Sequence, residues 1–255
     1  MCRWLTYMGP SILIEELIYE PEHSLIDQSH HAIESKSAIN ADGVGVGWYS
    51  EWPDPGLYRQ IQPAWNDTNL KNLARHVRSH LFFAHVRAST GTDVTIANCH
   101  PFSSGHLMFM HNGQVRHYDK VRRAMEAAIP DKVYANRCGT TDSESLFLMM
   151  HAYDVEEDPI GAYRKTIQSI EQMQRDAGLK PDVRITAVLS DGKSLTAVRY
   201  ATNIEAPTLY WADESHQLTL ASEPFEPSGD NWKGVPDNHA LHVKDGNIRT
   251  IEALF

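Results

Sequence analysis

The chain begins Met1-Cys2-Arg3-Trp4-Leu5-Thr6-Tyr7-Met8, and its alternating side chains predict a β-strand that ends at the Gly9-Pro10 turn. Removal of Met1, which the small side chain of Cys2 should permit, would leave a thiol and a free α-amine on one residue. The reference pKa is about 7.7–8.0 for an α-amine and about 8.5 for a thiol, so near neutral pH the amine can accept the thiol proton. Cys2 is therefore a candidate nucleophile at the first residue of a strand. The alternative is a small hydrophobic residue buried near a chain end.

The composition is that of an acidic globular protein. The 255 residues are 42% hydrophobic and carry a formal net charge of −10, with no long basic block. We therefore expect one core, a single domain over residues 1–255, and no surface for nucleic acid or an anionic membrane. The start of the chain does not resemble a secretory signal, and no stretch has the length and apolar character of a membrane span, so we expect a cytoplasmic location. Three scattered cysteines argue against a disulfide framework.

The order of the predicted elements favours antiparallel sheets covered by helices. Strand patterns come first, helical patterns dominate residues 118–176, and strand patterns return from residue 184. Because few strand–helix–strand units are present, this order favours an α+β fold over a doubly wound one. Near the start, Ser11 can cap a short helix that ends at Pro21, and residues 23–41 are predicted to be a polar loop, either a lid over a site or a plain surface loop.

The strand predicted at residues 44–49 carries glycines at every second position. The G-x-G-x-x-G spacing of a dinucleotide site is absent, and no helical pattern follows. The glycines instead favour close approach of another backbone or a ligand to this strand.

Three polar positions are candidates for a binding site, and each has a structural alternative. Arg87 ends an apolar strand, where its planar side chain can grip a carboxylate or form an internal ion pair. The Asn112-Gly113 pair is either a tight turn or a pair of donors for an oxyanion. Asp142 follows Thr141 at the start of a predicted helix, where it is either a first-turn acid favoured by the helix dipole or a partner for an ammonium group.

The histidine and cysteine spacings do not favour a metal site. His76 and His80 lie four apart but lack the glutamate of a zinc-protease motif. A set built from Cys99, His100 and neighbouring histidines matches no common zinc framework. We therefore expect neither a metal nor another cofactor.

Taken together, several short motifs resemble the class II glutamine amidotransferases, a branch of the N-terminal-nucleophile hydrolases. They occur in the family's order over roughly the first 150 residues and are Met1-Cys2, Asn40-Ala41-Asp42-Gly43-Val44-Gly45, His85-Val86-Arg87-Ala88-Ser89-Thr90, Asn98-Cys99-His100-Pro101, His111-Asn112-Gly113 and Thr141-Asp142-Ser143-Glu144. The segment Ala221-Ser222-Glu223-Pro224-Phe225 is similar to one in stand-alone members, including the γ-glutamyl hydrolase of ergothioneine biosynthesis.

The resemblance implies an αββα sandwich of two antiparallel sheets between helical layers, and it implies a role for each matching residue. Cys2 would be the nucleophile, with its freed α-amine as base, and Asn112 and the Gly113 N–H would form the oxyanion hole. Arg87 would bind the α-carboxylate of a glutamyl group and Asp142 its α-ammonium. The remaining matches line or support the pocket: His85, Thr90 and His100. The chain departs from the family's arginine motif at Ala88 and Gly91, which affects the pocket entrance.

The same resemblance implies hydrolysis of a γ-glutamyl amide through a γ-glutamyl thioester, with release of glutamate. Only about 105 residues follow the matching segment, too few for a synthase, so we favour a self-contained hydrolase acting on glutamine or a small γ-glutamyl compound. One alternative is a glutaminase subunit that delivers ammonia to a separate synthase partner. Another is a non-catalytic protein that binds a glutamyl group.

Overall fold

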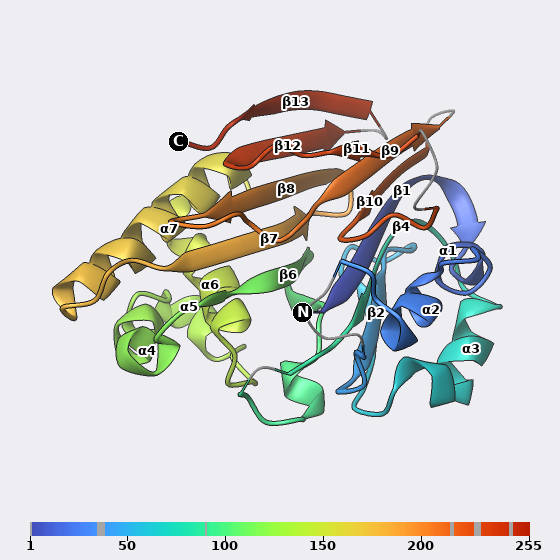
Figure 1. The fold of residues 1–255 in the computed structure, drawn as a ribbon, viewed down its shortest axis with the longest axis horizontal. Helices are drawn as coiled ribbons and strands as arrows, with labels where there is room; N and C mark the ends of the chain where they lie inside the picture. Colours follow the sequence, from blue (N-terminus) through green and yellow to red (C-terminus); the bar gives the residue numbers. More distant parts are fainter. Residues whose placement is uncertain (1, 35–38, 90, 215–216, 227–230, 245–246) are drawn as a thin grey trace.

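Two antiparallel sheets lie face to face, and helices cover the outer face of each (Figure 1). The computed structural model of the protein describes residues 2–34, 39–89, 91–214, 217–226, 231–244 and 247–255. The predicted αββα arrangement is confirmed: strands precede helices, and the later strands return to extend both sheets.

The first sheet, sheet A, is built around the strand that follows Cys2. Its order within the described residues is β11 (Lys233–Gly234), β9 (Tyr210–Glu214), β10 (Gln217–Ala221), β1 (Arg3–Leu13), β4 (Arg78–Val86), β2 (Val44–Trp48) and β3 (Gly56–Gln60). In this register Trp4 lies opposite His85, and Leu5 lies opposite both Ala84 and Ala221. Cys2 therefore stands at the end of a central strand that is paired on both sides.

The second sheet, sheet B, carries the Asn-Gly pair. Its order is β13 (Asn247–Ala253), β12 (His239–Lys244), β8 (Ser194–Ala201), β7 (Val183–Ser190), β6 (Leu107–Val115) and β5 (Phe102–Ser104). Asn112 lies opposite Thr186 and Gly113 opposite Ile185, in the middle of the β6–β7 pair.

Three apolar clusters account for the four layers. Between the sheets, Trp4 and Phe83 of sheet A pack with Met110 and Val188 of sheet B. Outside sheet A, the cluster includes Leu5, Tyr7 and Phe82 together with residues of the first helices. Outside sheet B, the third cluster joins Phe109 and Ile185 to α6 and α7. Alternate residues of β1 thus face different cores, as the period of a strand requires.

The helices divide between the two outer layers. Those over sheet A are α1 (Glu15–Ile18), α2 (Leu25–His30) and α3 (Thr68–Ala74), and those over sheet B are α4 (Tyr118–Ala127), α5 (Asp131–Tyr134), α6 (Asp142–Met150) and α7 (Pro159–Asp176). Short 3-10 turns lie at Ala64–Asn66, Ile96–Asn98 and His151–Tyr153.

Local expectations near the start of the chain were wrong in three places. The strand does not end at Gly9-Pro10 but continues to Leu13, because its pairing with β4 shifts register between Met8 and Ile12. Such an irregularity accommodates Pro10, which has no N–H to donate to a ladder. The predicted helix after Ser11 is reduced to α1, and the polar loop at residues 23–41 contains α2, whose first turn is capped by Ser24.

The glycine pattern of β2 has the predicted cause. A Cβ on Gly45 would collide with the backbone carbonyl of His100, and one on Gly47 would lie 2.7 Å from the Pro101 ring. The segment 99–101 therefore lies directly against β2, which places His100 beside sheet A.

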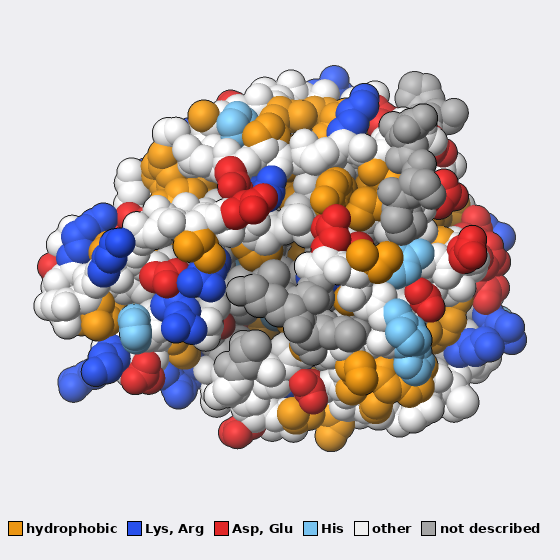
Figure 2. Space-filling view, in the orientation of Figure 1, with side chains coloured by type: hydrophobic (Ala, Val, Ile, Leu, Met, Phe, Trp, Pro, Cys, Tyr) orange, Lys and Arg blue, Asp and Glu red, His pale blue; other side chains and the backbone are white. Residues whose placement is uncertain are grey.

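On the face shown in Figure 2, acidic, basic and hydrophobic side chains are interspersed. In the part of the chain that the structure describes, no helix combines the length and apolar character needed to cross a membrane.

Candidate active site

Both sheets hold Cys2 in place. The Ala88 N–H, just beyond β4, points at the Cys2 Sγ at 3.3 Å, and the thiol lies 3.5 Å from the Ala88 carbonyl, to which it can donate. The Asn112 side chain of β6 donates from Nδ2 to the Cys2 carbonyl oxygen at 2.7 Å. The residue that precedes β1 is thus fixed by contacts from sheet A and sheet B together.

The environment of the Cys2 thiol favours its protonated form. Burial raises the pKa of this thiol, while the Ala88 N–H and the nearby Arg87 guanidinium act in the opposite direction. Because burial is the larger effect, the thiol needs a base to become a nucleophile near neutral pH.

The Asn112-Gly113 pair lies inside β6, so the tight-turn interpretation was wrong. Gly113 has a φ of 143°, a conformation that side-chain-bearing residues rarely adopt. A Cβ there would lie 2.6 Å from His111 Nε2 and 2.7 Å from the carbonyl carbon of Arg184. Only glycine fits this strand position, and its backbone lines the cavity beside Cys2.

Arg87 is buried and is bonded to neutral oxygens. Its Nη2 donates to Thr92 Oγ1 at 2.6 Å, to the Asp93 carbonyl at 3.2 Å and to Ser89 Oγ at 3.3 Å. Within the described residues, no carboxylate lies within ion-pair distance of its guanidinium, so the internal ion-pair interpretation finds no support there. Among the described residues, the positive charge on the cavity wall is therefore held by neutral oxygens.

Asp142 is the first residue of α6 and also lines the cavity. Its Oδ1 accepts from the Ser143 N–H at 2.9 Å and its Oδ2 from the Val115 N–H at 2.7 Å. Thr141 caps the helix, since its Oγ1 accepts from the Glu144 N–H at 3.2 Å. Asp142 is thus a first-turn acid whose carboxylate also ties α6 to β6.

Two buried histidines support the wall behind Cys2. The rings of His85 and His100 stack with their centroids 4.3 Å apart. Burial lowers the pKa of His85 to about 3 and that of His100 well below its usual value, so both are neutral. Their ring nitrogens make no hydrogen bond to another described residue, and the Asn112 side chain lies close enough to His85 to oppose its pKa shift.

One cavity of roughly 450 Å³ gathers five of the eight predicted site residues: Cys2, Arg87, His100, Gly113 and Asp142. Asn112 reaches this group through its bond to the Cys2 carbonyl, and His85 lies behind it against His100. Thr90 lies outside the residues that the structure describes. The predicted residues therefore come together around Cys2, while their chemical roles stay predictions.

Two features of the site were not predicted from the sequence: the contact of a backbone N–H with the Cys2 thiol, and the hydrogen bonds that orient His111. The Ala88 N–H carries no sequence signal, because every residue but proline has one. His111 accepts from the Ser143 hydroxyl at Nδ1, over 2.8 Å, and its Nε2 lies 3.2 Å from the Arg184 carbonyl. These two contacts fix the His111 ring beside Gly113. In the sequence, the only sign of this arrangement was that His111 directly precedes the Asn-Gly pair. Across the described ranges, no three His, Cys, Asp or Glu side chains are grouped so that they could hold a metal.

Comparison with known proteins gives one consistent result. The family model for class II glutamine amidotransferases matches residues 27–209. A probable glutamine amidotransferase of Saccharomyces cerevisiae is 31% identical, over 97% of this chain and 83% of its own. A γ-glutamyl-hercynylcysteine sulfoxide hydrolase of Mycobacterium tuberculosis is 28% identical, over 100% of this chain and 97% of its own. A solved glutamine aminotransferase class-II domain protein of Silicibacter pomeroyi superposes with a TM-score of 0.78 at 33% identity, covering 99% of both chains.

Proposed function

Because the chain belongs to the class II glutamine amidotransferases, a family of N-terminal-nucleophile hydrolases, we propose that it hydrolyses a γ-glutamyl amide bond with Cys2 as nucleophile. The observation that carries this proposal is the content of one cavity. A thiol, a guanidinium with no acidic partner in the described chain, and a carboxylate with no basic one line the same space. A glutamyl head group presents an amide carbonyl, a carboxylate and an ammonium to match them.

The names of two relatives support a γ-glutamyl substrate. The mycobacterial relative is a hydrolase of a γ-glutamyl compound, and the yeast relative is a probable glutamine amidotransferase. Both substrates share the glutamyl head and differ in the group that leaves. Arg87 and Asp142 can recognise the glutamyl head of either substrate, so our proposal concerns the type of reaction. The experiment below identifies the leaving amine.

Arg87 and Asp142 orient the substrate by charge. The Arg87 guanidinium can donate two parallel hydrogen bonds to the α-carboxylate. The Asp142 carboxylate, whose oxygens already accept from two backbone N–H groups, is held in place to receive the α-ammonium. Hydrogen bonds to charged groups contribute about 1.5–3 kcal/mol each, enough to select a free α-amino acid head.

The first chemical step uses the amine that removal of Met1 exposes. The Cys2 α-amine takes the thiol proton, and Sγ attacks the γ-carbonyl carbon. Asn112 and the Gly113 N–H stabilise the resulting oxyanion. The Asn112 amide carries two hydrogens, so one remains for the oxyanion while the other bonds the Cys2 carbonyl. Collapse of this intermediate returns the proton to the leaving nitrogen and forms a γ-glutamyl thioester.

The second step hydrolyses the thioester. The α-amine, now neutral, removes a proton from water, which attacks the same carbonyl carbon, and the same donors hold the second oxyanion. Glutamate leaves and the thiol is restored.

The test is glutamate release from L-glutamine and from a panel of γ-glutamyl amides and peptides. The protein used is confirmed by mass to begin at Cys2, and Cys2→Ala is the control. Release that depends on Cys2 supports the proposal, and the best substrate identifies the leaving amine. Activity on glutamine that requires a co-purifying synthase would point to a glutaminase subunit. Binding of glutamate without release from any substrate would overturn the proposal in favour of a binding protein.

A further inference from the structure

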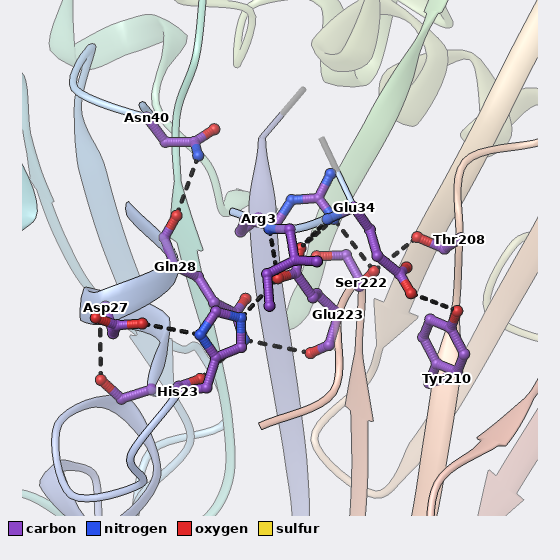
Figure 3. A network of polar contacts seen from close by, with 12 residues as sticks. Arg3, His23, Asp27, Gln28, Glu34, Asn40, Thr208, Tyr210, Ser222 and Glu223 are labelled. Atoms are coloured by element: carbon purple, nitrogen blue, oxygen red, sulfur yellow. Dashed lines mark hydrogen bonds and ion pairs between the residues drawn. The ribbon is translucent and has the colours of Figure 1, made fainter. Parts of the chain in front are cut away.

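On the side of β1 opposite to the cavity, a buried carboxylate joins three parts of the chain (Figure 3). The Glu223 Oε2 accepts from Arg3 Nη1 at 3.3 Å and from the Glu34 N–H at 3.0 Å. Its Oε1 accepts from the Ile33 N–H at 2.9 Å and bonds His23 Nε2 at 2.6 Å. Four donors thus converge on one side chain that is almost fully buried.

Through Arg3, this carboxylate contacts the residue that directly follows the nucleophile in the chain. Arg3 and Cys2 are neighbours, and alternation along the strand turns their side chains to opposite faces of sheet A. The Arg3 and Glu223 side chains are 1% and 2% exposed, so the pair is shielded from water. The neighbouring residues Trp4 and Ser222 are also joined by hydrogen bonds. The Ser222 N–H donates to the Trp4 carbonyl, and the Trp4 N–H donates to Ser222 Oγ.

The other contacts of Glu223 tie this pair to the segment around α2. His23 lies between two carboxylates, with Nδ1 2.8 Å from Asp27 and Nε2 on Glu223. Tyr210 of β9 donates to the Glu34 carboxylate at 2.8 Å and closes the network at its outer edge. Figure 3 shows Arg3 and His23 directed at Glu223 from different sides.

We propose that Glu223 is a positioning residue for the nucleophile, acting through Arg3. The proposal rests on the proposed function, since it assigns a role in the same reaction. Cys2 precedes β1 and takes no part in its pairing with neighbouring strands. Its position therefore depends on its contacts with Ala88 and Asn112 and on its covalent link to Arg3. A buried ion pair resists displacement, because moving either partner leaves a charge uncompensated at low dielectric.

Glu223→Gln tests this proposal, with Glu171→Gln as the matched control. Glu171 of α7 is also a buried carboxylate that accepts from an arginine and from neutral donors: Arg175 at 3.0 Å, Tyr200 at 2.7 Å and Thr202 at 2.9 Å. It lies on a helix over the outer face of sheet B, and its polar partners in the described chain do not belong to the site. Both substitutions remove one negative charge and keep the side-chain shape, so a general loss of stability should be common to them.

Two readouts separate positioning from stability, both at a temperature where each variant is folded. We expect Glu223→Gln to lower kcat by about tenfold or more while KM changes by less than about threefold, because a displaced nucleophile affects the chemical step. Alkylation of Cys2 by iodoacetamide, followed by peptide mass, should also change its rate in Glu223→Gln and stay unchanged in Glu171→Gln. Equal effects of the two variants on both readouts would overturn the proposal, as would a Glu223→Gln variant with normal kcat.

Arg3→Lys carries the same test if Glu223→Gln does not fold. Lysine keeps the positive charge beside Glu223 and loses the planar guanidinium, so the protein should still fold while Cys2 is held less firmly in position. The alkylation readout needs no substrate, which keeps the two hypotheses distinguishable. A wild-type chain that releases no glutamate would refute the proposed function, and Cys2 alkylation would still decide whether Glu223 positions the thiol.

Discussion

Replacing Gly113 by alanine should disable the oxyanion hole through the backbone. The new Cβ would lie 2.7 Å from the Arg184 carbonyl carbon and still closer to its oxygen, where ordinary contact begins at 3.4 Å. The β6–β7 pair would therefore have to separate locally by about 0.7 Å or more. Since Gly113 supplies the proposed donor N–H, that N–H would move with it.

The expected loss can be estimated from the two effects that the geometry combines. Loss of one oxyanion donor costs about 10²–10³ in kcat, and misplacement by about 1 Å costs a similar factor. We therefore expect kcat to fall by about 10²–10³, equivalent to about 2.7–4 kcal/mol of transition-state stabilisation. The conformation at φ 143° adds a stability cost of about 1–3 kcal/mol for a residue with a side chain.

The assay is steady-state glutamate release at a temperature well below the midpoint of unfolding, with urea denaturation to measure stability. Gly178→Ala is the control, because Gly178 also has a positive φ, 73°, but a Cβ added there would meet no atom within 4 Å. It should lose stability and keep its kcat. Asn112→Ala should lose activity to a similar degree without the steric clash. A folded Gly113→Ala variant with kcat within about threefold of wild type would refute the role of this N–H.

Three further predictions concern the charged and buried groups. Arg87→Lys should raise KM by about 10–100-fold with little change in kcat, because lysine loses the two-pronged grip on a carboxylate; an unchanged KM in steady-state kinetics would contradict this. Asp142→Asn should weaken binding of a γ-glutamyl substrate but not of its analogue without the α-amine; equal effects on both KM values would argue against contact with an ammonium. The pKa of His85 is lowered to about 3 and that of His100 is also depressed, so below pH 6.5 the unfolded chain binds protons that the folded chain does not. The free energy of unfolding should then fall, by up to about 1.4 kcal/mol per pH unit for each histidine, as urea titrations from pH 7.5 to 5 can measure.

The sequence was most informative where a residue type is required for steric or electrostatic reasons. The glycines of β2 predicted a close backbone contact, and the segment 99–101 lies there. Strand and helix order predicted antiparallel sheets covered by helices, because burial periodicity is a local property. The four-layer arrangement was implied by the family resemblance. The extension of β1 through Pro10 and the helix α2 were missed, since each depends on partners distant in the sequence. The same holds for Glu223, whose importance lies in contacts with residues about 190 and 220 positions away.

The Asn-Gly pair shows why a site can be located before its geometry is known. The dipeptide by itself favours a turn, and the structure holds it in a strand because β7 pairs with β6 from Met108 to Val115. Tertiary pairing overrode the local preference, and glycine allows the positive φ that residue 113 adopts in this strand. At this cavity wall the positive φ and the close backbone of β7 together require glycine, so the residue type follows from the local geometry.

The two buried arginines near Cys2 differ in their partners, and this difference distinguishes a structural arginine from one that can bind a substrate. Arg3 meets the Glu223 carboxylate, so its charge is compensated within the fold. Arg87 is also buried, yet its neighbours in the described chain are hydroxyl and carbonyl oxygens, which stabilise a cation less than a carboxylate does. A buried cation left in that condition destabilises the empty protein, and a ligand carboxylate would remove the penalty on binding. Within the described chain, the arginine that positions the nucleophile is therefore paired with a carboxylate, and the one that faces the cavity is not. This is the asymmetry expected of a binding site for an acidic head group.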